Sequence, residues 1–150
     1  VEAVQRLARS RIGAIIAIEG DVGLEEYALT GSKVEARISA EMLTTIFTPY
    51  SPLHDGAVIV RGDHITAAGA ILPLTQYSMA DKSLGTRHRA ALGLSEETDA
   101  VVVVVSEETA RISVARRGRL ERDVDAERLR EILSGAVLQP GAAPAPAPAH

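Results

Sequence analysis

Three short segments of the chain carry side chains that suit chemistry on phosphate groups, and the first is Leu53–Ala57. It stands between a loop broken by prolines and an apolar run, so Asp55 is expected where a strand begins. A carboxylate projecting from a sheet there could hold a divalent metal or accept a proton. Gly56 would let a ligand or another stretch of backbone approach closely. Asp-Gly is also a common turn dipeptide, so a plain turn is the alternative interpretation.

The second segment, Gly85–Ala91, places a hydroxyl and two arginines where a helix is expected to begin. The free N–H groups and the dipole at a helix start attract anions. Thr86 adds a hydroxyl donor, and Arg87 and Arg89 add planar, permanently charged groups suited to phosphate oxygens. The alternative is a solvated basic face that pairs with Glu96 or Glu97.

The third segment, Ser106–Thr109, follows the apolar run Ala100–Val105, which is typical of a central strand buried on both faces. Ligands of α/β sheets bind beyond the carboxyl ends of strands. A hydroxyl beside Glu107 and Glu108 suits a phosphate contact and metal ligation by oxygen. A cap or a turn would explain the same residues. Together the three segments indicate phosphoryl chemistry on a nucleotide, although the sequence has no P-loop and no Gly-x-Gly-x-x-Gly run.

Alternating short strands and amphipathic helices are expected to position these segments. Apolar spacing predicts helices over 2–11, 40–47, 86–94 and 125–133, and strands over 14–18, 33–38, 57–60, 64–72, 100–105, 111–115 and 120–122. Gly13 is expected to end the first helix, and Ser39 to cap the second, which Pro49 and Pro52 stop. The pattern predicts an α/β fold, a single domain with a mixed central β-sheet flanked by helices.

Composition narrows the classes of function. A length of 150 residues fits one domain, and 46% hydrophobic with only 3% aromatic residues predicts a core of Val, Ile, Leu and Ala. A net charge of −4 argues against general nucleic-acid binding. The absence of cysteine excludes disulfides and thiolate chemistry. The tail alternates Pro and Ala, so we expect the domain to span 1–138 and residues 139–150 to be disordered.

Two of the three segments resemble the signature motifs of the diadenylate cyclase family. These motifs are Asp55-Gly56-Ala57, within Pro52–Val58, and Arg87-His88-Arg89, within Leu84–Ala91; Ser106–Thr109 follows at a spacing typical of the family. The resemblance runs from about Val4 to Leu133. It implies an enzyme that joins two ATP molecules into cyclic di-AMP and releases two pyrophosphates.

The resemblance also implies a role for each site residue. Asp55 would assist deprotonation of the attacking 3′-hydroxyl, and Leu72 would pack on adenine or belong to the core. His88 would contact phosphate or brace the site, and the brace is the favoured role. The expected catalytic residues are Asp55, Gly56, Arg87 and Arg89; the expected ATP contacts are Leu72, Gly85, Thr86, Arg87, His88, Arg89, Ser106 and Glu107; and the expected ligands of Mg²⁺ or Mn²⁺ are His54, Asp55 and Glu108.

The resemblance further implies a homodimer, in which two ATP-loaded protomers meet face to face and each 3′-hydroxyl attacks the α-phosphate of the opposite ATP. His54, the segment Gly31–Ile38 and the run Ser106–Thr109 resemble the membrane-tethered branch of the family. Transmembrane helices precede the cyclase domain in that branch. We therefore expect a full-length protein anchored at the cytoplasmic face of the cell membrane. A regulatory protein is a possible partner, and nucleic acid is not expected to bind.

Two rival hypotheses come from other classes of function. A nucleotide sensor would bind ATP or cyclic di-AMP without turnover. An interaction module would use the motif residues only as caps and turns, and would gain no thermal stability from nucleotide.

Ala70 and Ile71 stand where some members of the family have larger or aromatic residues. The resemblance therefore leaves the residues that contact adenine open.

Overall fold

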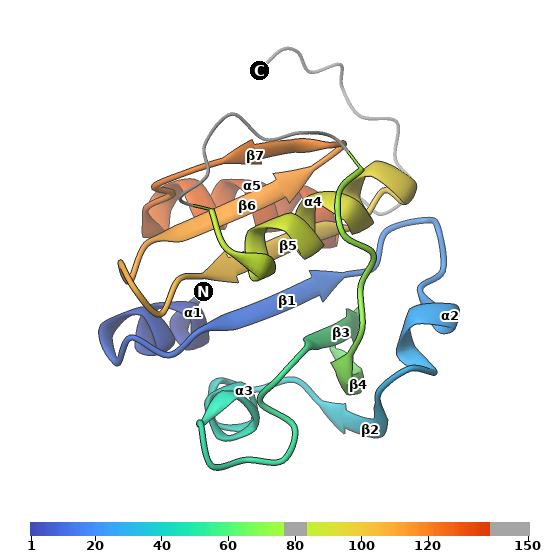
Figure 1. The fold of residues 1–150 in the computed structure, drawn as a ribbon, viewed down its shortest axis with the longest axis horizontal. Helices are drawn as coiled ribbons and strands as arrows, with labels where there is room; N and C mark the ends of the chain where they lie inside the picture. Colours follow the sequence, from blue (N-terminus) through green and yellow to red (C-terminus); the bar gives the residue numbers. More distant parts are fainter. Residues whose placement is uncertain (77–83, 139–150) are drawn as a thin grey trace.

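The run Val101–Val105 forms strand β5, and all of its residues are buried. The computed structural model describes residues 1–76 and 84–138. Within them β5 belongs to a seven-stranded sheet of order β2-β4-β3-β1-β5-β6-β7 (Figure 1). A strand with neighbours on both sides and helices over both faces has no exposed side chain, which is why a continuous valine run suits this position.

The remaining elements follow the expected order. They are α1 (Glu2–Arg9), β1 (Ala14–Ile18), α2 (Glu25–Ala28), β2 (Ser32–Arg37), α3 (Ala40–Phe47), β3 (Ala57–Arg61), β4 (His64–Ala70), α4 (Thr86–Glu97), β6 (Ile112–Arg116), β7 (Arg119–Glu121) and α5 (Ala126–Leu138). The prediction of one α/β domain with a mixed sheet is confirmed. The single turn α2 was not predicted, and α1 is shorter than expected because Arg11 has a φ of 54°. The predicted disorder of 139–150 lies outside the described residues.

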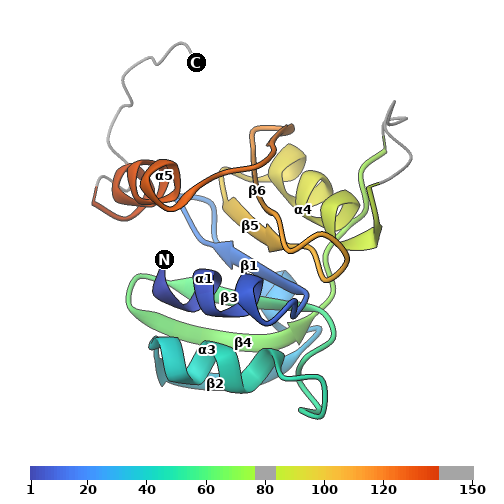
Figure 2. The same ribbon diagram turned by 90° about the vertical axis from the view of Figure 1, so that its left-hand side faces the viewer.

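Two apolar cores lie on opposite faces of the sheet. One packs α1, α3 and α5 against the sheet, and its most buried side chains include Leu7, Phe47 and Leu129. The other packs α4 and the α2 region against the opposite face, with Leu24 and Leu94 fully buried. Figure 2 shows α5 and α4 on either side of β5 and β6. Both helix layers therefore fix the sheet between them.

Strand direction brings the first and third sequence segments to one end of the sheet. β1 and β3 are parallel, whereas β4 and β5 run antiparallel to their neighbours β3 and β1. The end at which β1 and β3 begin is therefore the end at which β4 and β5 finish, and we call it the Gly13 end, after the residue that precedes β1. It lies at the left of Figure 1 and faces the viewer in Figure 2.

The segment that leaves β4 runs closely over α4. The backbone N–H of Thr75 donates to the carbonyl oxygen of Arg89 at 3.0 Å, and the Thr75 hydroxyl donates to Glu96. A β-carbon placed on Gly93 would lie 1.9 Å from the carbonyl oxygen of Pro73. The segment can therefore touch the helix only because position 93 has no side chain.

We predict that Gly93→Ala lowers the free energy of unfolding by about 1–3 kcal/mol, because a backbone carbonyl cannot move aside without moving the whole segment. Urea unfolding measures the change. Gly135→Ala in α5 is the matched control, since no atom lies within 4 Å of its β-carbon position. The control should leave the stability unchanged or raise it, because alanine favours a helix over glycine. Equal effects of the two substitutions would contradict the packing argument.

Candidate nucleotide-binding site

The side chain of Arg87 joins the start of α4 to the start of β1. A β-carbon placed on Gly13 would lie 2.5 Å from Cζ, 2.7 Å from Nη1 and 2.8 Å from Nη2 of Arg87. Nη1 also donates to Oε1 of Glu107 at 2.8 Å, and Glu107 is the second residue after β5. The first turn of α4 therefore lies at the Gly13 end, where Arg87 reaches both β1 and the turn that follows β5.

Asp55 lies at the same end of the sheet. The parallel register pairs Ile16 of β1 with Val58 of β3, so the two strands begin at the same end of the sheet. Asp55 comes two residues before β3 and Gly13 one residue before β1. The exposed carboxylate and the guanidinium of Arg87 therefore lie at the same end of the sheet.

Gly56 fits both interpretations made from the sequence. Its φ is +98°, which favours glycine, so the Asp-Gly pair does form a bend. A β-carbon at Gly56 would also lie 2.8 Å from the carbonyl oxygen of Ala70. The expected close approach is thus made by the backbone at the end of β4, which holds Asp55 in place.

His54 is fixed by the loop before β3. Its Nδ1 lies 2.8 Å from the carbonyl oxygen of Ser51. A carbonyl only accepts hydrogen bonds, so Nδ1 carries the proton and the lone pair is left on Nε2. That tautomer, oriented by a backbone carbonyl, is the usual one for a metal-binding histidine.

The predicted metal ligands do not form a complete site by themselves. Among residues 1–76 and 84–138, no group of three or more His, Asp or Glu side chains is arranged to hold a metal ion. His54 and Asp55 are adjacent, whereas Glu108 belongs to the turn after β5 and is exposed. The remaining ligands of a hard cation would have to come from outside this set, for example from phosphate and water oxygens.

The turn after β5 is held by its own hydrogen bonds. The Ser106 hydroxyl accepts from the backbone N–H groups of Glu108 and Thr109, each at 3.2 Å. This is the turn that the sequence analysis gave as the alternative, and it leaves the hydroxyl proton of Ser106 free to donate. Nη1 of Arg11 donates to the carbonyl oxygen of Glu108 at 2.8 Å and ties the turn to the loop before β1.

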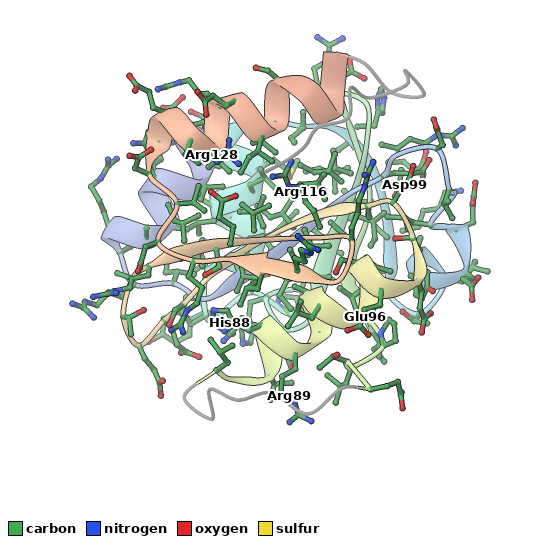
Figure 3. The ribbon with its side chains drawn as sticks, turned by 90° about the horizontal axis from the view of Figure 1, so that it is seen from above. His88, Arg89, Glu96, Asp99, Arg116 and Arg128 are labelled. Carbon is green, nitrogen blue, oxygen red and sulfur yellow. The ribbon has the colours of Figure 1, made fainter. Side chains whose placement is uncertain are left out.

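The two other residues of the Arg-His-Arg motif differ in environment. Figure 3 shows Arg89 pointing outward from α4, where it is exposed and has no ion pair or hydrogen bond of its side chain within the described residues. His88 is half-buried, and its Nδ1 has no partner in residues 1–76 and 84–138. Burial lowers the pKa of His88, and the charges of Arg122 and Arg87 lower it further. A neutral, half-buried ring favours the brace interpretation.

The pairing of the α4 arginines with Glu96 or Glu97, which the basic-face alternative expected, is not found among the described residues. Glu96 accepts from the Thr75 hydroxyl and Glu97 accepts from Tyr27, so neither carboxylate pairs with Arg87 or Arg89. The partner of Arg87 is Glu107, which comes from another element. At least Arg89 therefore remains available at the start of α4, beside the unpaired backbone N–H groups of the first turn.

Leu72 packs in the core, which favours the core role over the adenine contact. It is only 7% exposed and lies in the apolar cluster beneath α4. The preceding residue, Ile71, is 68% exposed at the same end of the sheet.

Gly85 precedes α4 as an N-cap without a side-chain hydrogen bond, and Thr86 is exposed in the first turn. Sequence reasoning missed Gly13, which it treated only as a helix terminator.

Comparison with known proteins identifies relatives of this chain. A family model described as DisA bacterial checkpoint controller nucleotide-binding matches residues 1–120. A diadenylate cyclase from Listeria monocytogenes is 49% identical over 132 residues, which are 88% of this chain and 48% of the relative. The chain thus spans about half the length of the curated relatives it matches first.

Solved structures agree with the fold. The crystal structure of a double mutant of DacA from Staphylococcus aureus has a TM-score of 0.88 at 49% identity, with 90% of each chain covered. A protein from Bacillus cereus described as a hypothetical membrane spanning protein has a TM-score of 0.78 at 48% identity, over 81% of this chain and 60% of the other. The family suggested by the two motifs is therefore confirmed.

We predict that His88 makes the domain less stable as the pH falls. The unfolded chain takes up a proton near the ordinary pKa of histidine, about 6.5. The lowered pKa of His88 makes the folded state take up that proton only at lower pH, so the free energy of unfolding should fall as pH drops below about 6.5.

Urea unfolding between about pH 7.5 and 5.5 tests this prediction, because that range crosses the ordinary pKa of histidine. His88→Gln should lose less stability over the range than the unchanged protein does. His64→Gln removes an exposed histidine in the β3–β4 hairpin and should behave like the unchanged protein. The same pH dependence in all three proteins would rule out His88 as the cause.

Proposed function

Because the chain belongs to the diadenylate cyclase family, we propose that it joins two ATP molecules into cyclic di-AMP and two pyrophosphates. The observation that supports the proposal is that Asp55, before β3, and the guanidinium of Arg87, against Gly13, lie at the same end of the sheet. One protomer therefore offers a carboxylate and a cation at that end. Positioning and charge stabilisation are the main requirements of phosphoryl and nucleotidyl transfer.

The start of α4 is the proposed binding place of the triphosphate. Unpaired N–H groups of the first turn, the Thr86 hydroxyl and the Arg89 guanidinium are all exposed there. Arg87 gives one N–H group to Glu107 and keeps its other N–H groups. We propose that these donors hold the phosphates and that Ser106 and Glu107 line the same pocket from the turn after β5.

We propose that Asp55 takes the proton from the attacking 3′-hydroxyl. The 3′-oxygen then forms a bond to the α-phosphorus of the opposite ATP. The bond between that phosphorus and the oxygen bridging to the β-phosphate breaks, and its electron pair leaves with pyrophosphate. Each ATP undergoes this step once, so the ring closes when both bonds have formed.

The residues before β3 suit a hard divalent cation. His54 presents Nε2 and Asp55 presents carboxylate oxygens, and we propose that both ligate Mg²⁺ or Mn²⁺, with Glu108 reaching it from the turn after β5. The cation would neutralise phosphate charge. The remaining ligands would come from the triphosphate and water.

The proposed reaction needs two protomers related by a two-fold axis, since each site holds one of the two ATP molecules. Ile71 is exposed beside the site at the end of β4, which supports a contact with a second copy there. We also propose that segments outside this chain tether the full-length protein at the cytoplasmic face of the membrane. Within the described residues no helix is long and apolar enough to span a bilayer.

We predict that Asp55→Asn lowers the rate of cyclic di-AMP formation by about 100-fold or more, since general bases contribute about 10²–10⁴-fold. Mass spectrometry of the product measures the rate, and ATP should still raise the melting temperature. Asp63→Asn, an exposed aspartate in the β3–β4 turn, is the control and should keep full activity. Full activity of Asp55→Asn would remove that carboxylate from the chemistry.

We predict that chelation of divalent metal stops product formation and that Mn²⁺ or Mg²⁺ restores it. His54→Ala should need a higher metal concentration for half-maximal rate, because one ligand is lost. ATP binding without product under every metal tested would favour the sensor hypothesis. No rise in melting temperature with ATP would favour the interaction module.

A further inference from the structure

We infer that Gly13 is a positioning residue: its missing side chain is the slot that holds the Arg87 guanidinium in its phosphate-binding orientation. The inference rests on the proposed function, because it concerns how Arg87 meets ATP. Gly13 itself touches no reacting atom. Its role would be exerted through Arg87 alone.

The guanidinium lies flat against Gly13. The β-carbon position of Gly13 is 2.5 Å from Cζ and almost as close to both terminal nitrogens, at 2.7 and 2.8 Å. Nearly equal distances to all three atoms mean that the planar group faces Gly13 with its surface and not with its rim. The N–H groups therefore point sideways, where they can donate in the plane.

Backbone conformation does not explain the glycine. Gly13 is absent from the glycines with positive φ, which are Gly56, Gly62, Gly69 and Gly118. Its φ is not in the left-handed region that favours glycine, so the space beside it is the structural demand that Gly13 meets. The atoms that fill this space belong to Arg87.

The same loop also fixes the partner of Arg87. Arg11, two residues before Gly13, donates to the carbonyl oxygen of Glu108 at 2.8 Å. This contact holds the turn that carries Glu107, whose carboxylate receives Nη1 of Arg87. The guanidinium is thus oriented on one face by Gly13 and on one rim by Glu107. Its remaining N–H groups donate to no other group within residues 1–76 and 84–138.

A methyl group at position 13 would displace the guanidinium and spare the fold. Non-bonded carbon atoms need about 3.5–4.0 Å, so a contact of 2.5 Å forces Cζ to move by at least about 1 Å. Arg87 can make this movement, because the clash is with the end of a long side chain. A misplacement of about 1 Å at a reacting centre can cost about 100-fold in rate.

The test is Gly13→Ala, with Gly135→Ala as the control. We expect Gly13→Ala to keep the melting temperature within a few degrees, to lower kcat/KM for cyclic di-AMP formation about 10- to 100-fold, and to show a displaced Arg87 guanidinium in a crystal structure without nucleotide. Gly135→Ala should leave kcat/KM and the position of the Arg87 guanidinium unchanged, and should not lower the melting temperature. A guanidinium that stays in place, or a variant with unchanged kcat/KM, would overturn the inference.

A double-mutant cycle separates positioning from a general structural role. The affinity for α,β-methylene ATP, which cannot react, is measured for the unchanged protein, Gly13→Ala, Arg87→Ala and the double variant. If Gly13 acts through Arg87, Gly13→Ala weakens binding in the unchanged protein and has less than about a twofold effect once Arg87 is removed. Equal loss in both backgrounds would overturn the inference.

Failure of the proposed function gives a different result. In that case the unchanged protein neither binds the analogue nor makes cyclic di-AMP. The pair of crystal structures still decides whether Gly13 holds the guanidinium.

Discussion

The polarity of four strands is the constraint on which the whole site depends. β1 and β3 begin, and β4 and β5 finish, at the Gly13 end of the sheet. A carboxylate that precedes β3 and a turn that follows β5 are thereby separated by a single strand, β1, and Arg87 bridges the remaining space from α4. Reversing β3 would send Asp55, and reversing β5 would send Glu107, to the far end of the sheet.

Electrostatics explains why such a site can exist in an acidic protein. The chain carries a net charge of −4, so long-range attraction does not bring ATP to it. In the proposed complex, binding would come from local donors: the first turn of α4, Thr86 and the guanidinium groups of Arg87 and Arg89. Glu107 occupies one rim of Arg87, which holds the cation in a fixed geometry without consuming its other donors. The close packing of Pro73 on Gly93 holds the residues directly after β4 against α4.

Local patterns in the sequence predicted most of the fold and part of the site. Five consecutive valines, the Ser39 cap and the short hairpin turns are local signals, and each specified its element. The one-turn helix α2 was missed because four residues carry too little periodicity. The sequence could not reveal that Arg87 packs on Gly13 or that Arg11 holds the turn after β5, because these contacts join residues far apart in the chain. A leucine at position 72 could equally belong to the core or contact adenine, and it is the burial of Leu72 in the structure that favours the core.

The central claim is that one triphosphate lies between the start of β3 and the start of α4. A crystal structure of the protein with α,β-methylene ATP and Mn²⁺ tests it most directly. The account predicts phosphate oxygens within hydrogen-bond distance of the Arg87 guanidinium, and a ribose 3′-hydroxyl from a partner protomer turned towards Asp55. A nucleotide bound at the opposite end of the sheet, or one that contacts neither residue, would contradict it.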